Sequence, residues 1–547
     1  MTEEITEDEY ILDEEFLQRI YIWQEKMRFI QSLFDLSCDE EGKINEEEIN
    51  KFKNDIYKMK KDIYLQSNYT QKFIEIIEPT PIIQSKFFIN NANITKVKLP
   101  KSLKIIQNGA FCNCVNIENI EIPEDCLLDT IEAGAFANCI SLKDIRIPNK
   151  ITTIEESTFK GCISLISISF PKSLQQIKKE AFLGCKNLLK VLLPPSLKSI
   201  GNRSFSECEK LSYFSLPGVL AVIPFDENIS FQENVSNNFS IPLDCFYKSF
   251  NKSETKLILI IEDICNSIDD NSFNSCEMIE QIHINIGNEI SFGDSSFCNC
   301  RNLKTIKLNN KKEEEMIKLI VKNNAFKDCS ELISFEFPNA SNVELGTSIF
   351  ENCIKLQNVI LPDSIDNISK KMFYGCFSLE NINLNDKLNE IGSGSFYKCT
   401  KFNIEHLPDS LKKINISAFY GCETLSLEKL PASIEIIEGC AFSHCTNLLI
   451  NTFPDKLTEI KEKAFEHCHM LDTLTIPSTM KKIGERAFHK CKKLNNVINN
   501  SKDIEFEDEV FSECQALINF QTKKQFESIP YSVFIQCHPD FTPSNII

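Results

Sequence analysis

One short motif, Phe-x-x-Cys, recurs along most of the 547 residues and constrains the fold more than any other feature. It occurs at 17 of 19 regularly placed phenylalanines between Phe88 and Phe534. Nine of these, from Phe350 onward, are each 23 residues apart, and so are the four from Phe136 to Phe205. A fixed period of roughly 20–50 residues is typical of repeat proteins, whose units stack and bury a shared core. We therefore expect about nineteen stacked coils rather than one globular domain.

The coil from Leu142 to Ser164, LKDIRIPNKITTIEESTFKGCIS, shows what each repeat contributes. Its first stretch, Leu-x-x-Ile-x-Ile, alternates apolar and polar positions as a short half-buried strand does. Proline ends this strand because it cannot donate to a β-ladder. The next apolar-x-x-Ile piece predicts a second short strand. The segment around Phe159 and Cys162 then predicts a helical or 3-10 return turn that carries the phenylalanine inward.

The repeat loosens in the middle of the chain, where the steps between anchors after Phe205 are 41, 27, 24 and 29 residues. Two anchors lack the cysteine and have Asn91 or Ser249 in its place. These changes divide the chain into an acidic helical hairpin (1–80), a regular array (81–217), irregular repeats with insertions (218–330) and a second regular array (331–547). Inserts of a solenoid emerge as loops, which often carry function.

The segment Leu471–Cys491, LDTLTIPSTMKKIGERAFHKC, closely resembles the BspA-like leucine-rich repeat, L-x-x-I-x-I-P-x-S-[VL]-x-x-I-G-x-x-A-F-x-x-C. The resemblance covers about residues 85–540. It implies a curved, right-handed α/β leucine-rich-repeat solenoid of short strands and helical turns. It also implies adhesion or protein–protein recognition, and no catalytic residues. Structural roles fall to the repeated pairs Phe373/Cys376, Phe396/Cys399, Phe465/Cys468 and Phe488/Cys491.

The 24 cysteines are more consistent with a packed ladder than with disulfides. Seventeen occupy one repeat position, where stacked coils hold neighbouring side chains parallel, and a relaxed disulfide needs crossed vectors. We expect free buried thiols that act as small, soft core residues. The pairs Cys112/Cys114 and Cys298/Cys300 lack the spacing of a zinc site.

Three consecutive coils break the strand pattern and are the candidate protein-binding site. Each has an apolar residue where the strand should face water and a polar residue where it should face the core. If the register holds, the apolar residues form an exposed stripe, which is typical of an interaction site. A bulge would turn them inward, and this is the alternative that we favour. The residues of this site are Ile404, Leu427, Ile450, His406, Lys429 and Thr452, beside the polar Glu405, Glu428 and Asn451.

The histidines offer the only other candidate chemistry in the repeats. His444 and His467 occupy the same coil position and should stack, with His469 and His489 close by. They could converge on a metal, or be tolerated surface residues of a turn, and we favour the second. No nucleophile elbow, zinc-protease motif, Walker A loop or dinucleotide loop is present. We therefore expect a protein that is not an enzyme and needs no cofactor.

The N-terminal segment lacks the repeat and predicts two helices, at about 10–36 and 46–65, from its apolar spacing. Between them, SCDEEGKINEEE (37–48) resembles an EF-hand loop, with Asp39, Glu41, Asn45 and Glu48 at liganding positions. Ser37 replaces the usual first aspartate, and Asn45 with Glu48 also fits a helix cap that needs no metal. Calcium binding is therefore the weaker alternative.

Charge and segment composition narrow the function further. A net charge of −19 disfavours nucleic acid as a partner. No secretory signal or transmembrane segment is recognisable, so we expect a cytoplasmic protein, with the cell surface by an unconventional route as the alternative. The leading hypothesis is a module that binds a protein partner through its concave face or insert loops. The alternatives are a cell-surface adhesin and a calcium-modulated module acting through residues 37–48.

Overall fold

The computed structural model describes residues 72–545, apart from 77–79, 217–218, 223–238, 253–255, 262–264, 311–316 and 339. The chain divides into two compact units, Met1–Thr70 and Gln71–Ile547, and every described residue belongs to the second. The predicted helices at 10–36 and 46–65 and the predicted calcium loop at 37–48 lie outside the described residues. The second unit alone is considered below.

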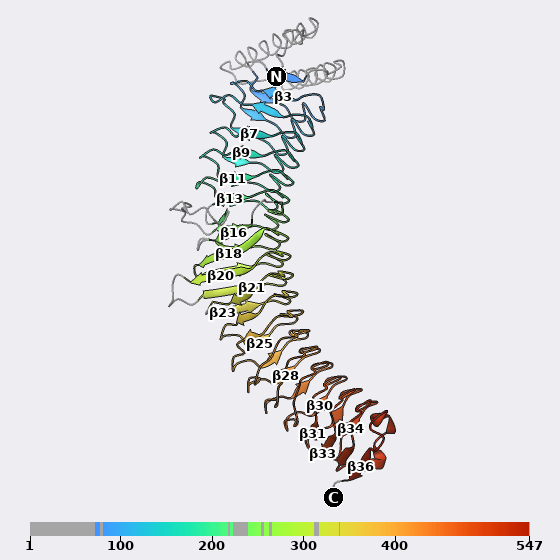
Figure 1. Cartoon of the computed structure of the whole chain (residues 1–547). Helices are drawn as coiled ribbons and strands as arrows, with labels where there is room; N and C mark the ends of the chain where they lie inside the picture. Colours follow the sequence, from blue (N-terminus) through green and yellow to red (C-terminus); the bar gives the residue numbers. More distant parts are fainter. Residues whose placement is uncertain are drawn as a thin grey trace, which may run out of the picture. The chain divides into compact units, whose positions relative to one another are not determined.

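This unit is a solenoid in which successive coils stack along parallel strands (Figure 1). Leu-x-x-Ile-x-Ile gives the first strand of a coil, and equivalent residues pair 23 apart, as Asp144 does with Ser167. The first strands are β1 (Phe73–Glu75), β3 (Lys96–Lys98), β5 (Asn119–Glu121), β7 (Asp144–Arg146), β9 (Ser167–Ser169), β11 (Lys190–Leu192), β13 (Tyr213–Leu216), β16 (Leu257–Ile261), β18 (Ile279–Ile286), β20 (Thr305–Asn310), β22 (Ser334–Glu336), β24 (Asn358–Ile360), β26 (Asn381–Ile382), β31 (Thr473–Ile476), β33 (Asn496–Asn499), β35 (Asn519–Thr522) and β36 (Thr542–Asn545).

The second, mostly shorter strand of each coil forms a separate set of parallel sheets. Its members are β2 (Ile82–Ile83), β4 (Ile105–Ile106), β6 (Thr130–Ile131), β8 (Thr153–Ile154), β10 (Gln176–Ile177), β12 (Ser199–Ile200), β15 (Phe239–Ile241), β17 (Cys265–Ile268), β19 (Glu289–Phe292), β21 (Ile317–Val321), β23 (Ala340–Leu345), β25 (Asn367–Ile368), β27 (Glu390–Ile391), β28 (Lys413–Ile414), β29 (Ile436–Ile437), β30 (Glu459–Ile460), β32 (Lys482–Ile483) and β34 (Glu505–Phe506). The long step after Phe205 accommodates one additional strand, β14 (Val219–Val222), which pairs antiparallel with both β13 and β16.

The expected helical or 3-10 return turn takes the form of a run of tight turns, some with hydrogen bonds three residues back, and not of a regular helix. Around Phe111, the Cys114 amide donates to the Phe111 carbonyl at 3.1 Å, three residues back, whereas the Phe111 amide donates to Ala135 of the next coil at 2.8 Å. The residues two before and two after the phenylalanine, Gly109 and Asn113, have positive φ. Left-handed residues at this spacing stop a helix from propagating. The described helical segments are the 3-10 turns η2 (Phe526–Ser528) and η3 (Tyr531–Phe534) near the end of the stack.

The nineteen anchor phenylalanines form one continuous column through the core. Every adjacent pair from Phe88 to Phe534 is stacked, with ring centroids 5.0–5.9 Å apart. The column continues through Phe246, although 41 residues separate it from Phe205. The prediction of a stacked repeat is therefore confirmed, and the irregular middle keeps the same core as the regular arrays.

The repeated cysteines form a second column with a specific bonding role. All 17 thiols donate to the carbonyl oxygen of the anchor phenylalanine in the preceding coil, at 2.9–3.4 Å. Ser249, which replaces the cysteine in one coil, makes the same bond through its hydroxyl, to Phe205 at 2.6 Å. Every cysteine among the described residues is free. The position thus selects a small buried donor, and not merely a soft apolar side chain.

Candidate functional site

Of the two alternatives for the apolar residues of the three irregular coils, the structure shows the favoured inward turn and not the exposed stripe. Leu427 and Ile450 are fully buried in the core, and Ile404 is half-buried against it. Glu428 is exposed, as are Glu405 and Asn451 of the neighbouring coils. Burying these polar groups without partners would cost more than the inward turn, so the backbone brings the apolar residue to the core.

A one-residue shift between coils produces this inward turn. In a regular coil the Leu189 amide donates to the Ile166 carbonyl, 23 residues away, at 3.0 Å. Between the coils of Leu427 and Ile450, the Leu449 amide donates to the Leu427 carbonyl, 22 residues away, also at 3.0 Å. Between β26 and β31 the described coils form no first strand, apart from a bridge between Thr452 and Thr475. Thr452, His406 and Lys429 remain exposed.

The predicted stacking of histidines is present at the edge of the return segments. The His444 and His467 rings stack with centroids 4.4 Å apart, and His467 meets His469 and His489 edge-on at 5.6 and 6.1 Å. Burial, with the neighbouring imidazoles and Lys490, lowers the pKa of His467 to about 4. His489 Nδ1 is hydrogen-bonded to the Ser512 hydroxyl at 2.7 Å.

This histidine cluster extends a column of aromatic rings from the preceding coils. Tyr374, Tyr397 and Tyr420 stack at 4.4 and 4.7 Å, and Tyr420 meets His444 at 5.2 Å. Within the part of the chain that the structure describes, no group of three or more His, Cys, Asp or Glu side chains is placed to hold a metal ion. The stacked rings pack the edges of these coils against one another.

The outward face of the first strands carries the side chains with the fewest contacts inside the coil. In β7, β9 and β24 the central residue of the strand is buried and its two neighbours are exposed. The exposed residues are mostly short and polar, for example Ser167, Ser169 and Asn358. Their backbone is fixed by the parallel ladder on both sides, so this face is rigid while its side chains are free to differ from coil to coil.

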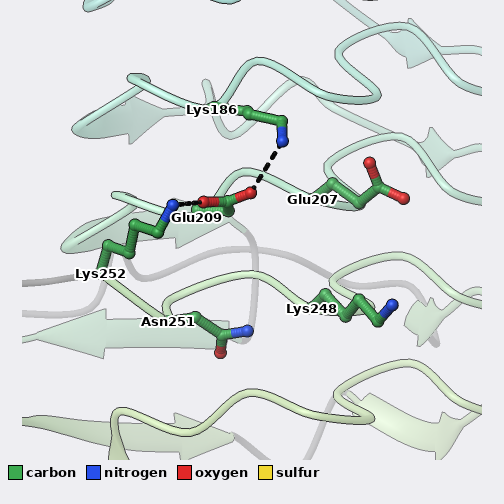
Figure 2. Close-up of a pocket in the computed structure, with 6 residues that line it drawn as sticks. All are labelled: Lys186, Glu207, Glu209, Lys248, Asn251 and Lys252. Carbon is green, nitrogen blue, oxygen red and sulfur yellow. Dashed lines mark ion pairs between the residues drawn. The ribbon is translucent and has the colours of Figure 1, made fainter.

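One pocket of about 400 Å³ opens where the regular array meets the irregular middle. Figure 2 shows Glu209 at its centre, between Lys186 and Lys252 from the neighbouring coils. Lys186 Nζ lies 3.0 Å from the Glu209 carboxylate, which also pairs with Lys252. The lining is completed by Glu207, Asn251 and Lys248.

The charges of this pocket are only partly balanced. The hydrogen bond from Lys252 is the main cause that lowers the pKa of Glu209, so its carboxylate is ionised and shared by two ammonium groups. Lys248 lies over the Tyr247 ring at 5.1 Å, and no carboxylate of the described residues is within ion-pair distance of its ammonium. Sequence analysis missed this pocket. The change from Ile140 and Ile163 to Lys186 and Glu209 at one repeat position is the signal that could have indicated it.

A solenoid of this kind, with two-strand coils, a phenylalanine column and a cysteine column, defines a class of leucine-rich-repeat proteins. The chain belongs to the BspA-type leucine-rich-repeat family. Six matches to the model of this family cover residues 58–164, 81–212, 129–245, 225–316, 319–448 and 413–539. No curated protein matches the sequence. Among the described residues no helix has the length and apolar character needed to cross a membrane.

Several solved structures are similar to this chain at low sequence identity. A leucine-rich-repeat protein from Bacteroides ovatus is 19% identical, with 88% of this chain and 94% of that chain covered and a TM-score of 0.38. A leucine-rich cell surface protein from Faecalibacterium prausnitzii is 22% identical, covering 59% and 81%, with a TM-score of 0.36. The pneumococcal vaccine antigen PcpA is 19% identical, covering 67% and 89%, with a TM-score of 0.40.

Proposed function

We propose that the repeat array is a non-enzymatic module that recognises a protein partner through the outward face of its first strands. The observation that carries this proposal is the eleven-strand sheet from β7 to β26, in which strand pairing, parallel except at β14, fixes the backbone and leaves short polar side chains such as Ser167, Ser169 and Asn358 exposed. A rigid surface loses little conformational entropy on binding, and short polar groups suit hydrogen bonding to another protein.

Membership of the BspA-type repeat family supports the proposal, because stacked repeats offer extended surfaces of this kind. The inward positions are occupied by the phenylalanine and cysteine columns in coil after coil. The side chains at the outward positions can therefore differ from coil to coil, and a bound partner would contact these positions.

The test begins with proximity labelling by the full chain, followed by calorimetric titration of the purified partner. We expect the double substitution Ser167→Arg/Ser169→Arg in β9 to weaken binding by about tenfold or more, since two long charged side chains would stand in the interface. Thr152→Arg is the control, because Thr152 is exposed on the second-strand side of the preceding coil, away from the first-strand face. Equal affinities for both variants and the wild type would exclude the first-strand face as the binding surface.

A further inference from the structure

Exposed aliphatic side chains gather at one edge of three consecutive coils. This edge is the turn that leads from the ladder cysteine into the next first strand. We call Ile140, Ile163, Ile166 and Leu189 the edge patch; their exposed fractions are 39%, 39%, 45% and 42%. Scattered exposed apolar residues need no explanation, whereas a contiguous group marks an interaction site.

Backbone hydrogen bonds show that these residues are neighbours. The Ser164 amide donates to the Ile140 carbonyl at 3.0 Å, which places the turns of Ile140 and Ile163 side by side. The Leu189 amide donates to the Ile166 carbonyl, also at 3.0 Å, and places these two residues side by side in the same way. Because Ile163 and Ile166 lie in one turn, the four side chains form two adjacent columns about one strand spacing apart.

The edge patch leads directly into the charged pocket of Figure 2. Lys186 occupies the position of Ile140 and Ile163 in the next coil, and the Asn187 amide bonds to the Ile163 carbonyl at 3.1 Å. In the following coil, the Lys210 amide donates to the Lys186 carbonyl at 3.1 Å. We call the group Lys186, Lys248 and Lys252, with Glu207, Glu209 and Asn251, the lysine pocket.

The lysine pocket is locally basic in an acidic chain. Its lining holds three lysines and two glutamates, whereas the whole chain has a net charge of −19. One carboxylate, that of Glu209, neutralises only part of the charge of Lys186 and Lys252. A carboxylate from a partner could approach Lys248 and Lys252, and this attraction would be screened by salt.

We propose that the edge patch and the lysine pocket form one binding surface for a protein segment with aliphatic side chains followed by a carboxylate. The aliphatic groups cover Ile163, Ile166 and Leu189, and the carboxylate enters between the lysines. This inference rests on the proposed function in that the partner is a protein, but it uses the coil edge and not the outward face of the first strands.

The experiment uses the full chain, immobilised, to select from a random peptide library displayed on phage. The enriched peptide is then labelled with fluorescein and titrated by fluorescence anisotropy. We expect enrichment of sequences with two aliphatic residues followed by Asp or Glu. Ile163→Asn and Lys248→Ala should each weaken binding by about tenfold, as expected for losing one buried aliphatic group or one ion pair in an interface.

The matched control is Ile354→Asn, because Ile354 has the same repeat position and the same 39% exposure as Ile163 but belongs to the second array. It should change the affinity by less than about twofold. Circular dichroism checks that the exposed substitutions leave the fold intact. The proposal is overturned if no aliphatic–acidic peptide is enriched, or if all three variants bind alike. It is also overturned if phosphatidylserine vesicles, and not peptides, show the dependence on Ile163 and Lys248.

The outcome for this surface is separable from the outcome for the proposed function. The Ser167→Arg/Ser169→Arg variant should bind the selected peptide as the wild type does, within about twofold. Loss of the natural partner in that variant, with peptide binding retained, supports both proposals. If that variant still binds the partner and Ile163→Asn no longer binds the peptide, the proposal for the edge surface is supported. The proposal for the first-strand face is then excluded.

Discussion

The coils at 142–192 and those at 402–454 solve the same packing problem in different ways. In the first region each coil forms a first strand whose central residue, such as Ile145 or Ile168, is buried. In the second region that position is polar, no first strand forms, and the residue before it, such as Leu427, enters the core. The phenylalanine and thiol columns pass through both regions unchanged.

This difference shows which part of a coil holds the stack together. The return segment, with its ring, its thiol bond and its turns, is the same in both regions, whereas the first strand can be lost. The first strand can therefore differ from coil to coil without loss of the stack, whereas the return segment is kept. Four predictions test this division, from the largest expected effect to the smallest.

Replacing an anchor phenylalanine should destabilise both regions equally. We expect Phe182→Ala and Phe419→Ala each to lower the free energy of unfolding by about 3–5 kcal/mol, because each removes a fully buried ring from the column. Urea unfolding followed by circular dichroism measures the loss. A much smaller loss for Phe419→Ala would mean that the coils without a first strand are held by other contacts.

The inward turn in the second region predicts a contrast between adjacent residues. Leu427→Ala should cost about 2–4 kcal/mol, since Leu427 is fully buried, whereas Glu428→Ala should change stability by less than about 0.5 kcal/mol. The same urea unfolding experiment compares the two. Similar small effects would contradict the burial of Leu427 and restore the exposed stripe.

The thiol bond should contribute modestly and alike in both regions. We expect Cys185→Ala and Cys422→Ala each to lose about 1 kcal/mol, because the donor to the preceding phenylalanine carbonyl disappears. Cys422→Ser should lose less, as Ser249 makes the same bond naturally. If serine were worse than alanine at this position, the cysteine column would act through apolar packing alone.

Acid should weaken the second region selectively, and this is the smallest effect. The pKa of His467 is about 4 in the fold and roughly 6.5 in an unfolded chain, so the fold favours the neutral ring. Its contribution to stability is complete above about pH 6.5 and falls as the pH is lowered toward 4. Hydrogen exchange at these two pH values should show lost protection around His444 and His467.

The first region supplies the control for this pH effect. The positions equivalent to His444 and His467 are the glycines Gly161 and Gly184, which do not titrate. Their coils should keep their protection over the same pH range. His467→Gln should remove most of the pH dependence in the second region, and an unchanged dependence in that variant would assign it to other groups.

Most of the fold could be predicted from the sequence, because each coil repeats the residues that it buries. The period, the inward phenylalanines and the free thiols follow from spacing alone. The return turns could not be predicted, since residues such as Glu180 and Lys248 adopt positive φ that their types rarely show.

Less of the candidate site than of the fold could be predicted from the sequence. Leu427 points inward because of a one-residue shift between coils. The shift buries Leu427 and keeps the charged Glu428 in water, and its extent cannot be read from the sequence. The lysine pocket depends on a contact between Glu209 and Lys252, residues that the 41-residue step brings into adjacent coils. Each arrangement leaves a partial signal in the repeat, a polar residue at the fourth strand position in one case and charged residues at the Ile140 position in the other, but neither signal gives the contacts themselves.

The thiol bonds all have the same direction along the chain, from each cysteine back to the coil before it. Each coil therefore offers a phenylalanine carbonyl to the thiol of the next coil. Its own thiol donates to the carbonyl of the coil before it. During synthesis from the N-terminal end, every new thiol meets a carbonyl that is already in place. The array can thus grow one coil at a time, each finished coil serving as the template on which the next one closes.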